Sequence, residues 1–192
     1  MLIEDKDFNG INILEPTDQI SSFTREEFEN CTFTNCVLSN SDFSNSIFRD
    51  CEFKDCDLSL TQLKNTGFNN VSFVNCKLLG LDFSYCNSFL LSMNFKNCLL
   101  KMAIFYKLSL KNTSFQNCEM QEVDFSESDL TNASFDGCNL DKTVFDHTNL
   151  EKVDFTTSYN LSIDPERNRI RKASFSINNV LGLLNKYDIN ID

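Results

Sequence analysis

The feature that most constrains this chain is a repeat of five residues, which is most regular between Thr113 and Thr157. The middle residues of the successive fives in this stretch are Phe115, Met120, Phe125, Leu130, Phe135, Leu140, Phe145, Leu150 and Phe155. A period of five fits neither the 3.6-residue period of an α-helix nor the two-residue period of a β-strand. The repeat therefore has to be explained before any single element is assigned.

The same repeat covers most of the chain in two frames. All thirteen centres from Phe23 to Phe83 are Phe or Leu, and so are twelve of the thirteen from Phe95 to Phe155. The two frames differ by two residues, which places an insertion near residues 87–92. The residue two places before each centre is small, as at Cys31 and Ser41, and the other three positions are mostly polar. Two residues in every five are therefore expected to be buried.

This pattern resembles the pentapeptide-repeat family, whose repeat is roughly a small residue, Asp or Asn, Leu or Phe, and two polar residues. The resemblance extends over about Phe23–Phe155. It implies an all-β fold, a right-handed quadrilateral parallel β-helix with one repeat on each side and four repeats in each coil.

Residues of one kind recur at the spacing that such coils require. Coils stack at the ~4.8 Å spacing of hydrogen-bonded strands, so that like rings can stack on one another. Columns at twenty-residue spacing, with one step of twenty-two across the insertion, contain Cys36, Cys56, Cys76, Cys98, Cys118 and Cys138, and also Phe33, Phe53, Phe73, Phe95, Phe115, Phe135 and Phe155. Extrapolation by twenty residues adds Ile13 before the phenylalanine column and Phe175 after it.

The two ends of the chain depart from the repeat, and we expect them to cap one domain that spans residues 1–192. Residues 1–22 are predicted to form a short strand within Leu2–Asn12 and a cap or loop from Glu15 to Ser22. Residues 23–157 are predicted to form the β-helix, and residues 158–192 an irregular coil with a short α-helical cap. Ser176 is expected to begin that helix, and the face expected to close the last coil contains Ile177, Val180, Leu181 and Leu184. The alternation of Tyr187, Ile189 and Ile191 is typical of a strand.

The chain lacks the combinations of residues that catalysis or metal binding needs. Nine cysteines are expected to point inward, where a thiol packs as a small apolar group. The single histidine, His147, is expected at the surface, and no base is available to activate a nucleophile. No glycine-rich phosphate loop is present. We therefore predict no enzyme, no cofactor and no metal site.

The composition also indicates where the protein acts. An odd number of cysteines and an N-terminus unlike a secretion signal favour reduced thiols in the cytoplasm over a disulfide framework. No stretch approaches the ~18 apolar residues of a membrane helix, so no membrane partner is expected. The net charge of −11 disfavours direct binding to nucleic acid.

Charge is distributed unevenly along the chain. Residues 1–57 contain thirteen acidic and four basic residues, and residues 119–192 contain fourteen and seven. Between them lie residues 58–118, which we call the waist. The waist has a single acidic residue, Asp82, and six lysines, namely Lys64, Lys77, Lys96, Lys101, Lys107 and Lys111.

The waist also has apolar residues at positions that are polar in most other coils. These residues form a candidate protein-interaction patch on two neighbouring sides, and they are Leu60, Leu79, Tyr85, Leu99, Met102, Ile104 and Tyr106. A contiguous exposed apolar patch usually marks a contact surface, although long neighbouring side chains such as Lys101 can shield it. The insertion adds a candidate recognition bulge at Phe89, Leu90 and Leu91, and the alternative is a tolerated two-residue irregularity.

Two functional hypotheses follow. The first is a non-enzymatic scaffold that binds a protein partner, or a second copy of itself, through the waist. The second comes from the family resemblance, because its best-known members are the bacterial quinolone-resistance proteins, thought to engage DNA gyrase as acidic mimics of DNA. A DNA mimic needs a continuous negative potential, which the basic waist interrupts. A homodimer is also a candidate, through the middle coils or through Val180, Leu181 and Leu184.

Overall fold

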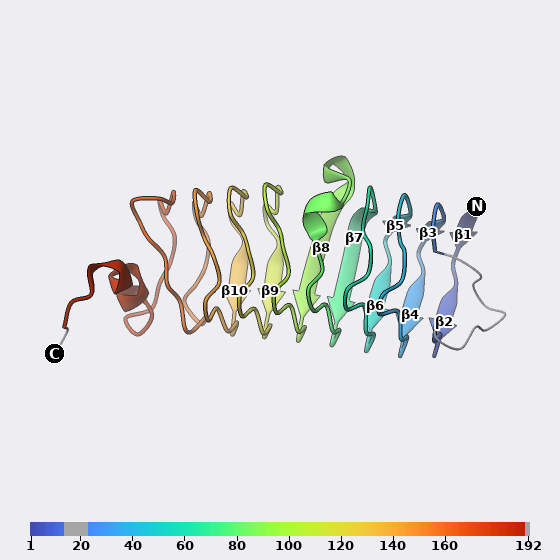
Figure 1. The fold of residues 1–192 in the computed structure, drawn as a ribbon, viewed down its shortest axis with the longest axis horizontal. Coiled ribbons are helices and arrows are strands. Elements are labelled where there is room, and N and C mark those ends of the chain that lie inside the picture. Colours follow the sequence, from blue (N-terminus) through green and yellow to red (C-terminus); the bar gives the residue numbers. More distant parts are fainter. Residues whose placement is uncertain (14–22, 191–192) are drawn as a thin grey trace.

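The chain winds into a long, narrow β-helix with its two ends far apart (Figure 1). The computed structural model describes residues 1–13 and 23–190. The loop predicted at Glu15–Ser22, and Ile191, lie outside these residues. All strand pairs and bridges are parallel, and the architecture is the right-handed, four-sided β-helix that the sequence predicted.

Short strands on two adjacent sides of the coils supply most of the regular hydrogen bonding. On the first side they are β1 (Leu2–Glu4), β3 (Glu27–Glu29), β5 (Ile47–Arg49) and the start of β7 (Gly67–Val74). On the second side they are β2 (Asp7–Asn9), β4 (Thr32–Thr34), β6 (Glu52–Lys54), the end of β7, β8 (Leu91–Lys96), β9 (Ser114–Gln116) and β10 (Ser134–Asp136). Isolated parallel bridges join the other sides of the coils, and they also continue the second side from Ser134 to Asp154 and Ser174.

The register of the strands confirms the twenty-residue coil and its one longer step. Phe28 pairs with Phe48, and Phe115 with Phe135, whereas Phe73 pairs with Phe95 across the insertion. The extrapolation to Ile13 is wrong, because Phe33 pairs with Phe8 at a distance of twenty-five residues. The first coil is thus five residues longer than the regular coils, and Ile13 instead lies half-buried against the core.

Stacked phenylalanines fill the centre of the β-helix. The column runs from Phe8 through Phe33 to Phe175, with neighbouring ring centroids 4.6–5.4 Å apart and nearly parallel rings. The prediction that Phe175 extends the column is therefore confirmed. Rings of the adjacent column contact it edge to face, as Phe105 contacts Phe95. Stacked and edge-to-face pairs are both favoured by the ring quadrupole, so one column stabilises its neighbour.

The corners of the coils have a conformation that explains the polar positions of the repeat. At almost every fifth residue the backbone is left-handed, with φ between 48° and 63° at non-glycine residues. Asn adopts this conformation more readily than other residues with a side chain. Asn97 and Asn117 are examples, and their side chains also bond to the coil before them, with Asn97 Nδ2 donating to Asn75 Oδ1 at 3.0 Å. The Asn positions are therefore structural.

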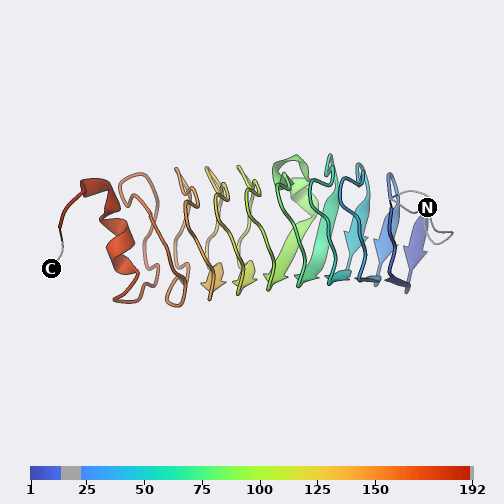
Figure 2. The same cartoon turned by 60° about the horizontal axis from the view of Figure 1, so that its bottom comes forward.

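The C-terminal cap differs from the predicted helix in type and in orientation (Figure 2). It consists of two 3₁₀ turns, η3 (Val180–Leu183) and η4 (Asn185–Tyr187). Ser176 is not the N-cap of η3, which is Asn179, but the two residues bond to each other across the turn before it: the Ser176 hydroxyl accepts the Asn179 N–H at 3.2 Å and Asn179 Oδ1 accepts the Ser176 N–H at 2.9 Å. Tyr187 and Ile189 do not form a strand, since Asp188 between them is left-handed with φ 48°.

The side of the cap that faces the last coil is also not the predicted one. Buried Asn179 donates to the carbonyl oxygens of Phe155 and Ser158, at 2.5 and 3.0 Å, and the Phe155 oxygen also accepts from the Ser158 N–H and hydroxyl. Gly182 lies against the backbone of Leu161, where a Cβ would clash. The face predicted to close the coil, made of Ile177, Val180, Leu181 and Leu184, is exposed.

Candidate protein-interaction surface

The predicted patch lies over two sides of the waist and the corner between them. Leu99 is bridged to Lys77 on one side, and Ile104 is bridged to Asp82 on the next. Leu60, Gly80 and Met102 occupy the intervening corner on successive coils, and we call this the Leu60 corner. The backbone there is left-handed at all three, with φ of 59°, 62° and 58°. Patch residues that are twenty or more positions apart in the sequence are therefore neighbours on adjacent coils.

Most of the patch is open to solvent. Leu60 is 60% exposed and Met102 is 49% exposed, while Tyr85, Leu99 and Tyr106 are exposed to 65%, 39% and 36%. Leu79 and Ile104 are partly buried. Because Leu60 and Met102 are not covered by the protein itself, burial within the chain does not account for their presence.

Leu60 and Met102 are also poor choices for the local backbone. A left-handed residue with a Cβ other than Asn or Asp costs roughly 1–2 kcal/mol. At the other left-handed corners of the described residues, a side chain other than Asn or Asp is charged or is His, as at Lys107 and Glu122, and only Leu60 and Met102 are apolar. Leu60 lies flat over the next coil, since a Cβ on Gly80 would come within 2.9 Å of its Cδ2 atom. An apolar residue at such a corner gives up local stability without gaining burial. This combination distinguishes the patch from ordinary exposed apolar residues.

Lysines surround the apolar residues. Lys77 and Lys101 lie on the side that carries Leu79 and Leu99, and Lys64 and Lys107 lie around Tyr106; all four are exposed. Lys77 is 3.9 Å from Asp57. Among the described residues, Lys64 and Lys101 have no carboxylate within ion-pair distance. The patch therefore combines an apolar centre with a positive rim.

One patch residue is tied to the section beyond the waist. The Tyr106 hydroxyl donates to Glu127 Oε1 at 2.9 Å, and Lys107 Nζ lies 3.3 Å from Glu127 Oε2 and 4.7 Å from the centre of the Tyr106 ring. The pKa of Glu127 is lowered, first by the Tyr106 hydroxyl and then by Lys107. The pKa of Lys107 is raised by the same two neighbours, Tyr106 first. Tyr106 is thus held in one orientation at the edge of the patch.

The insertion projects from the waist as a single short turn before β8 (Figure 1). It follows the turn η1 (Phe83–Tyr85) and contains the turn η2 (Ser88–Leu90). The Phe89 N–H donates to Asn87 Oδ1 at 3.1 Å and so caps η2. Leu90 covers Gly67, where a Cβ would come within 3.1 Å of it, and Leu91 pairs with Phe68 and packs against the core. Phe89 remains 95% exposed.

The three predicted bulge residues therefore have different positions. Leu90 and Leu91 fasten the bulge to the coil, and Phe89 alone is presented to solvent. Tyr85, at 65% exposure, ends the turn immediately before the bulge. Phe89 thus extends the aromatic part of the waist surface outward on a turn that is anchored at both ends.

The thiols and the histidine do not form a reactive site. All nine cysteines are buried, as predicted, and within the described residues all except Cys86 donate to backbone carbonyls, for example Cys56 Sγ to the Phe33 oxygen at 3.3 Å. Burial raises the pKa of Cys51 to about 12, so this thiol is protonated at neutral pH. His147 is exposed and 3.1 Å from Asp146. Within residues 1–13 and 23–190, no group of three metal-binding side chains is found.

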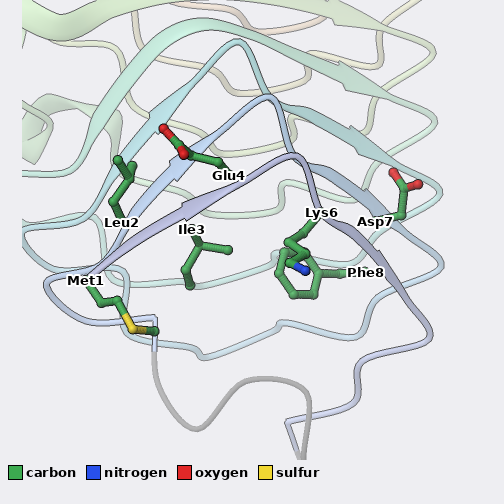
Figure 3. Close-up of a pocket in the computed structure, with 7 residues that line it drawn as sticks. All are labelled: Met1, Leu2, Ile3, Glu4, Lys6, Asp7 and Phe8. Atoms are coloured by element: carbon green, nitrogen blue, oxygen red, sulfur yellow. The ribbon is translucent and has the colours of Figure 1, made fainter.

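The N-terminal end of the β-helix carries a shallow depression lined by residues Met1–Phe8 (Figure 3). Ile3 and Phe8 point toward the inside of the first coil, whereas Leu2, Glu4 and Asp7 point away from it. Of the seven lining residues, Glu4, Lys6 and Asp7 are charged and Met1, Leu2, Ile3 and Phe8 are apolar. Within the part of the chain that is described, no helix is long and apolar enough to cross a membrane.

The predicted dimer residues of the cap are available for contact. Val180, Leu181 and Leu184 are 38%, 45% and 37% exposed on the side of the cap that faces away from the last coil.

The sequence alone did not show that the corners are left-handed, and hence did not show why Leu60 and Met102 are unusual. The signal was present in the frequency of Asn two places after each centre, as at Asn35, Asn75 and Asn97.

Comparisons with known proteins agree with this architecture. A family model described as "Pentapeptide repeat region" matches residues 26–105 and 88–159. Two trypsin-treated forms of QnrB1, a plasmid-mediated fluoroquinolone resistance protein, are similar in structure. One has a TM-score of 0.64 at 20% identity and full coverage of both chains. The other has a TM-score of 0.61 at 21% identity and covers 97% of this chain and 99% of its own.

A third solved structure is more distant. HetL, a pentapeptide repeat protein involved in heterocyst differentiation regulation in the cyanobacterium Nostoc, has a TM-score of 0.38 at 12% identity over 88% of each chain. The search of curated proteins found no match. At the identities of the QnrB1 structures, the likeness shows the fold.

Proposed function

Because the chain belongs to the pentapeptide-repeat family, we propose that it is a non-enzymatic scaffold that binds a protein partner through its waist. The observation that carries this proposal is the pair Leu60 and Met102, two exposed apolar residues at left-handed corner positions. Their placement lowers local stability and gains no burial, so a contact outside the chain is the function that accounts for them.

The composition of the surface indicates the chemistry of the partner. Interfaces are enriched in aromatic residues and Met at their centres, and Tyr85, Met102 and Tyr106 provide these in the waist. The surrounding lysines favour a partner with acidic residues around an apolar centre, since opposite potentials steer association. Phe89 adds an anchor that fits an apolar depression on the partner. The binding protein acts in the cytoplasm, without cofactor, catalysis, membrane contact or direct contact with nucleic acid.

A variant that replaces both corner residues by Asn tests the proposal. Asn is compatible with the corner backbone, so Leu60→Asn with Met102→Asn should fold and remove the apolar centre. The immobilised wild-type protein should retain a partner from a cytoplasmic extract, and the double variant should lose it at least tenfold. The partner is then identified by mass spectrometry and its binding is measured with purified proteins.

The matched control lies on the same side as Ile104, beyond the waist. Val144 is 45% exposed and follows Ile104 and Asp124 in the same line of bridges. Val144→Asn should bind the partner like the wild type. Equal retention by the Leu60/Met102 variant and the wild type would contradict the proposal.

The second candidate is a DNA mimic that binds DNA gyrase or a related topoisomerase, modulates it and confers quinolone resistance. The fold likeness to QnrB1 and the acidic sections 1–57 and 119–192 favour it. A gyrase supercoiling assay with micromolar protein, with and without a quinolone, separates the two candidates. If the protein neither inhibits gyrase nor protects it from the quinolone, the hypothesis of a DNA mimic is excluded.

A homodimer is compatible with either candidate, and the exposed residues Val180, Leu181 and Leu184 offer one surface for it. Sedimentation equilibrium distinguishes the two routes to a dimer. A cap dimer should dissociate when Leu181 and Leu184 are replaced by Asn, and a waist dimer when Leu60 and Met102 are replaced. A protein that sediments as a monomer at all concentrations would exclude both.

A further inference from the structure

One corner near the C-terminal end changes from amides to cations on successive coils. Its residues are Asn112, Asn132, Lys152 and Lys172, each with φ of 60°, and we call it the Lys152 corner. Asn132 Nδ2 donates to Asn112 Oδ1 at 3.3 Å, so the amides of this corner bond from coil to coil. Two lysines cannot continue the bonding, because an ammonium group has no acceptor. Coils stack ~4.8 Å apart, so Lys152 and Lys172 place like charges on adjacent coils.

Arg171 adds a third positive charge at the same place. The Lys152 N–H donates to the Arg171 carbonyl oxygen at 3.0 Å, which makes Arg171 the direct neighbour of Lys152 on the next coil. A small depression at the surface is lined by Glu151, Lys152, Arg171 and Lys172. Lys152, Arg171 and Lys172 therefore all line one hollow.

Three of the four other basic residues in residues 119–192 form ion pairs, and the exception, Lys142, lies at a different corner. Arg167 lies 2.6 Å from Asp146, Arg169 lies 2.6 Å from Glu151, and Lys186 lies 2.7 Å from Asp164. Among the described residues, Lys152, Arg171 and Lys172 have no carboxylate within ion-pair distance. The one carboxylate in the hollow, that of Glu151, is already engaged by Arg169. Three uncompensated cations remain.

We propose that the Lys152 corner binds a compact phosphoryl anion of the diphosphate type, held by Lys152, Arg171 and Lys172. The planar guanidinium of Arg171 can donate two parallel hydrogen bonds to a phosphoryl group, and each lysine contributes a mobile point charge. The anion would remove the repulsion between the lysines. This site is separate from the waist and does not depend on the function proposed for it.

The surroundings favour a small anion over a long one. The cations lie on two adjacent coils and span roughly 5 Å along the axis, which matches one or two phosphoryl groups. Residues 119–192 carry fourteen acidic against seven basic residues, so a nucleic acid that continued past the corner would meet a repulsive surface. A diphosphate satisfies the three cations without extending into that surface.

Binding is tested by NMR titration of the full chain with inorganic diphosphate at constant ionic strength set with NaCl. The expected result is saturable shifts centred on the amides of Lys152, Arg171 and Lys172. Lys152→Asn with Lys172→Asn restores the residue that the corner has at Asn112 and Asn132, so this variant should fold, and its affinity should fall at least tenfold. Arg171→Gln, as an independent variant, should also weaken binding.

The control is Lys142→Asn, which removes a lysine at another left-handed corner, with φ of 55°, and should leave the affinity unchanged within twofold. A phosphoserine peptide in a second titration tells whether the phosphoryl group is carried by a protein or is free. Tighter binding of either probe than of matched chloride supports the site. No localised shifts, equal affinity in the Asn variant, or preference for duplex DNA over diphosphate would overturn it.

Discussion

The waist, residues 58–118, and the section that follows it, residues 119–157, have the same internal structure and opposite surfaces. Phe95 and Phe115 stack at 5.1 Å in the waist, and Phe115 and Phe135 stack at 4.9 Å across its boundary. The corners are left-handed in both sections, as at Met102 and Asn132. Their backbones differ chiefly at the insertion before β8, where the waist has the turn η2.

The outward side chains differ sharply. In the waist, Leu60, Met102 and Tyr106 are exposed and a single acid stands among six lysines, whereas the section after it is strongly acidic with few exposed apolar residues. Because each coil contacts only its neighbours, a surface change in one coil leaves the stacking of the others intact. In a solenoid the interior determines the fold, and the outward positions are free to carry function.

The sharpest way to test this equivalence is to remove one core ring from each section. Phe95→Ala and Phe135→Ala delete rings that are fully buried and stacked on both sides. Each should lower the free energy of unfolding by about 3–5 kcal/mol, and the two losses should agree within about 1 kcal/mol. Urea unfolding followed by circular dichroism measures both. A much smaller loss for Phe95→Ala would mean that the waist has a softer core of its own.

Glycines at the corners provide a second comparison with a smaller effect. Gly80 in the waist and Gly137 beyond it have φ of 62° and 61°. Alanine at either position costs roughly 1–2 kcal/mol for the backbone alone. Gly137→Ala should cost more than Gly80→Ala, because its Cβ would meet Asn117 Oδ1, whereas a Cβ on Gly80 meets only the movable end of Leu60. Equal losses in thermal unfolding would contradict this ranking.

Exchanging corner residues between the sections tests whether the waist surface costs stability. Met102→Asn should leave the free energy of unfolding unchanged or raise it by up to about 1 kcal/mol, since Asn tolerates the left-handed corner better. The reverse exchange, Asn132→Leu, should lower the free energy of unfolding by about 1 kcal/mol. Leu tolerates the left-handed corner less well than Asn, and the hydrogen bond to Asn112 is lost. Denaturant midpoints of the two variants are compared directly. A loss of stability in Met102→Asn would show that the patch serves the fold.

The sequence predicted the interior far better than the ends or the corners. The spacing of Phe33, Phe53 and Phe73 predicted the coil because every core position repeats the same packing, and a regular sequence leaves only one register. The same reasoning failed at Ile13, since a longer first coil has no signature in the core pattern, and Phe8 took the position. At the cap, the apolar residues suggested burial, but the residue buried against the last coil is Asn179, which donates to the carbonyl oxygens of Phe155 and Ser158.

The candidate surface could be predicted only in outline. The two-residue frame shift and the apolar residues in polar positions located Phe89, Leu60 and Met102, because a departure from a strict repeat is visible in the sequence. The sequence did not show that Leu90 packs against the coil while Phe89 is exposed, since this depends on the space that Gly67 leaves for Leu90. The cationic corner was also missed, because the depression that Lys152, Arg171 and Lys172 share and the ion pairs of the other cations depend on where the side chains lie.

The smallest predicted effect concerns the contact that joins the two sections, between Tyr106 of the waist and Glu127 beyond it. The pKa of Glu127 is lowered in the folded protein, so its contribution to stability is present above the unfolded pKa and is lost as the pH falls through the folded pKa. Tyr106→Phe removes the main cause and should raise the pKa of Glu127 toward its ordinary value. Carboxyl NMR titration measures it, with Tyr85→Phe as the control. An unchanged Glu127 pKa in Tyr106→Phe would mean that Lys107 alone maintains the contact, and that Tyr106 is free to turn toward a partner.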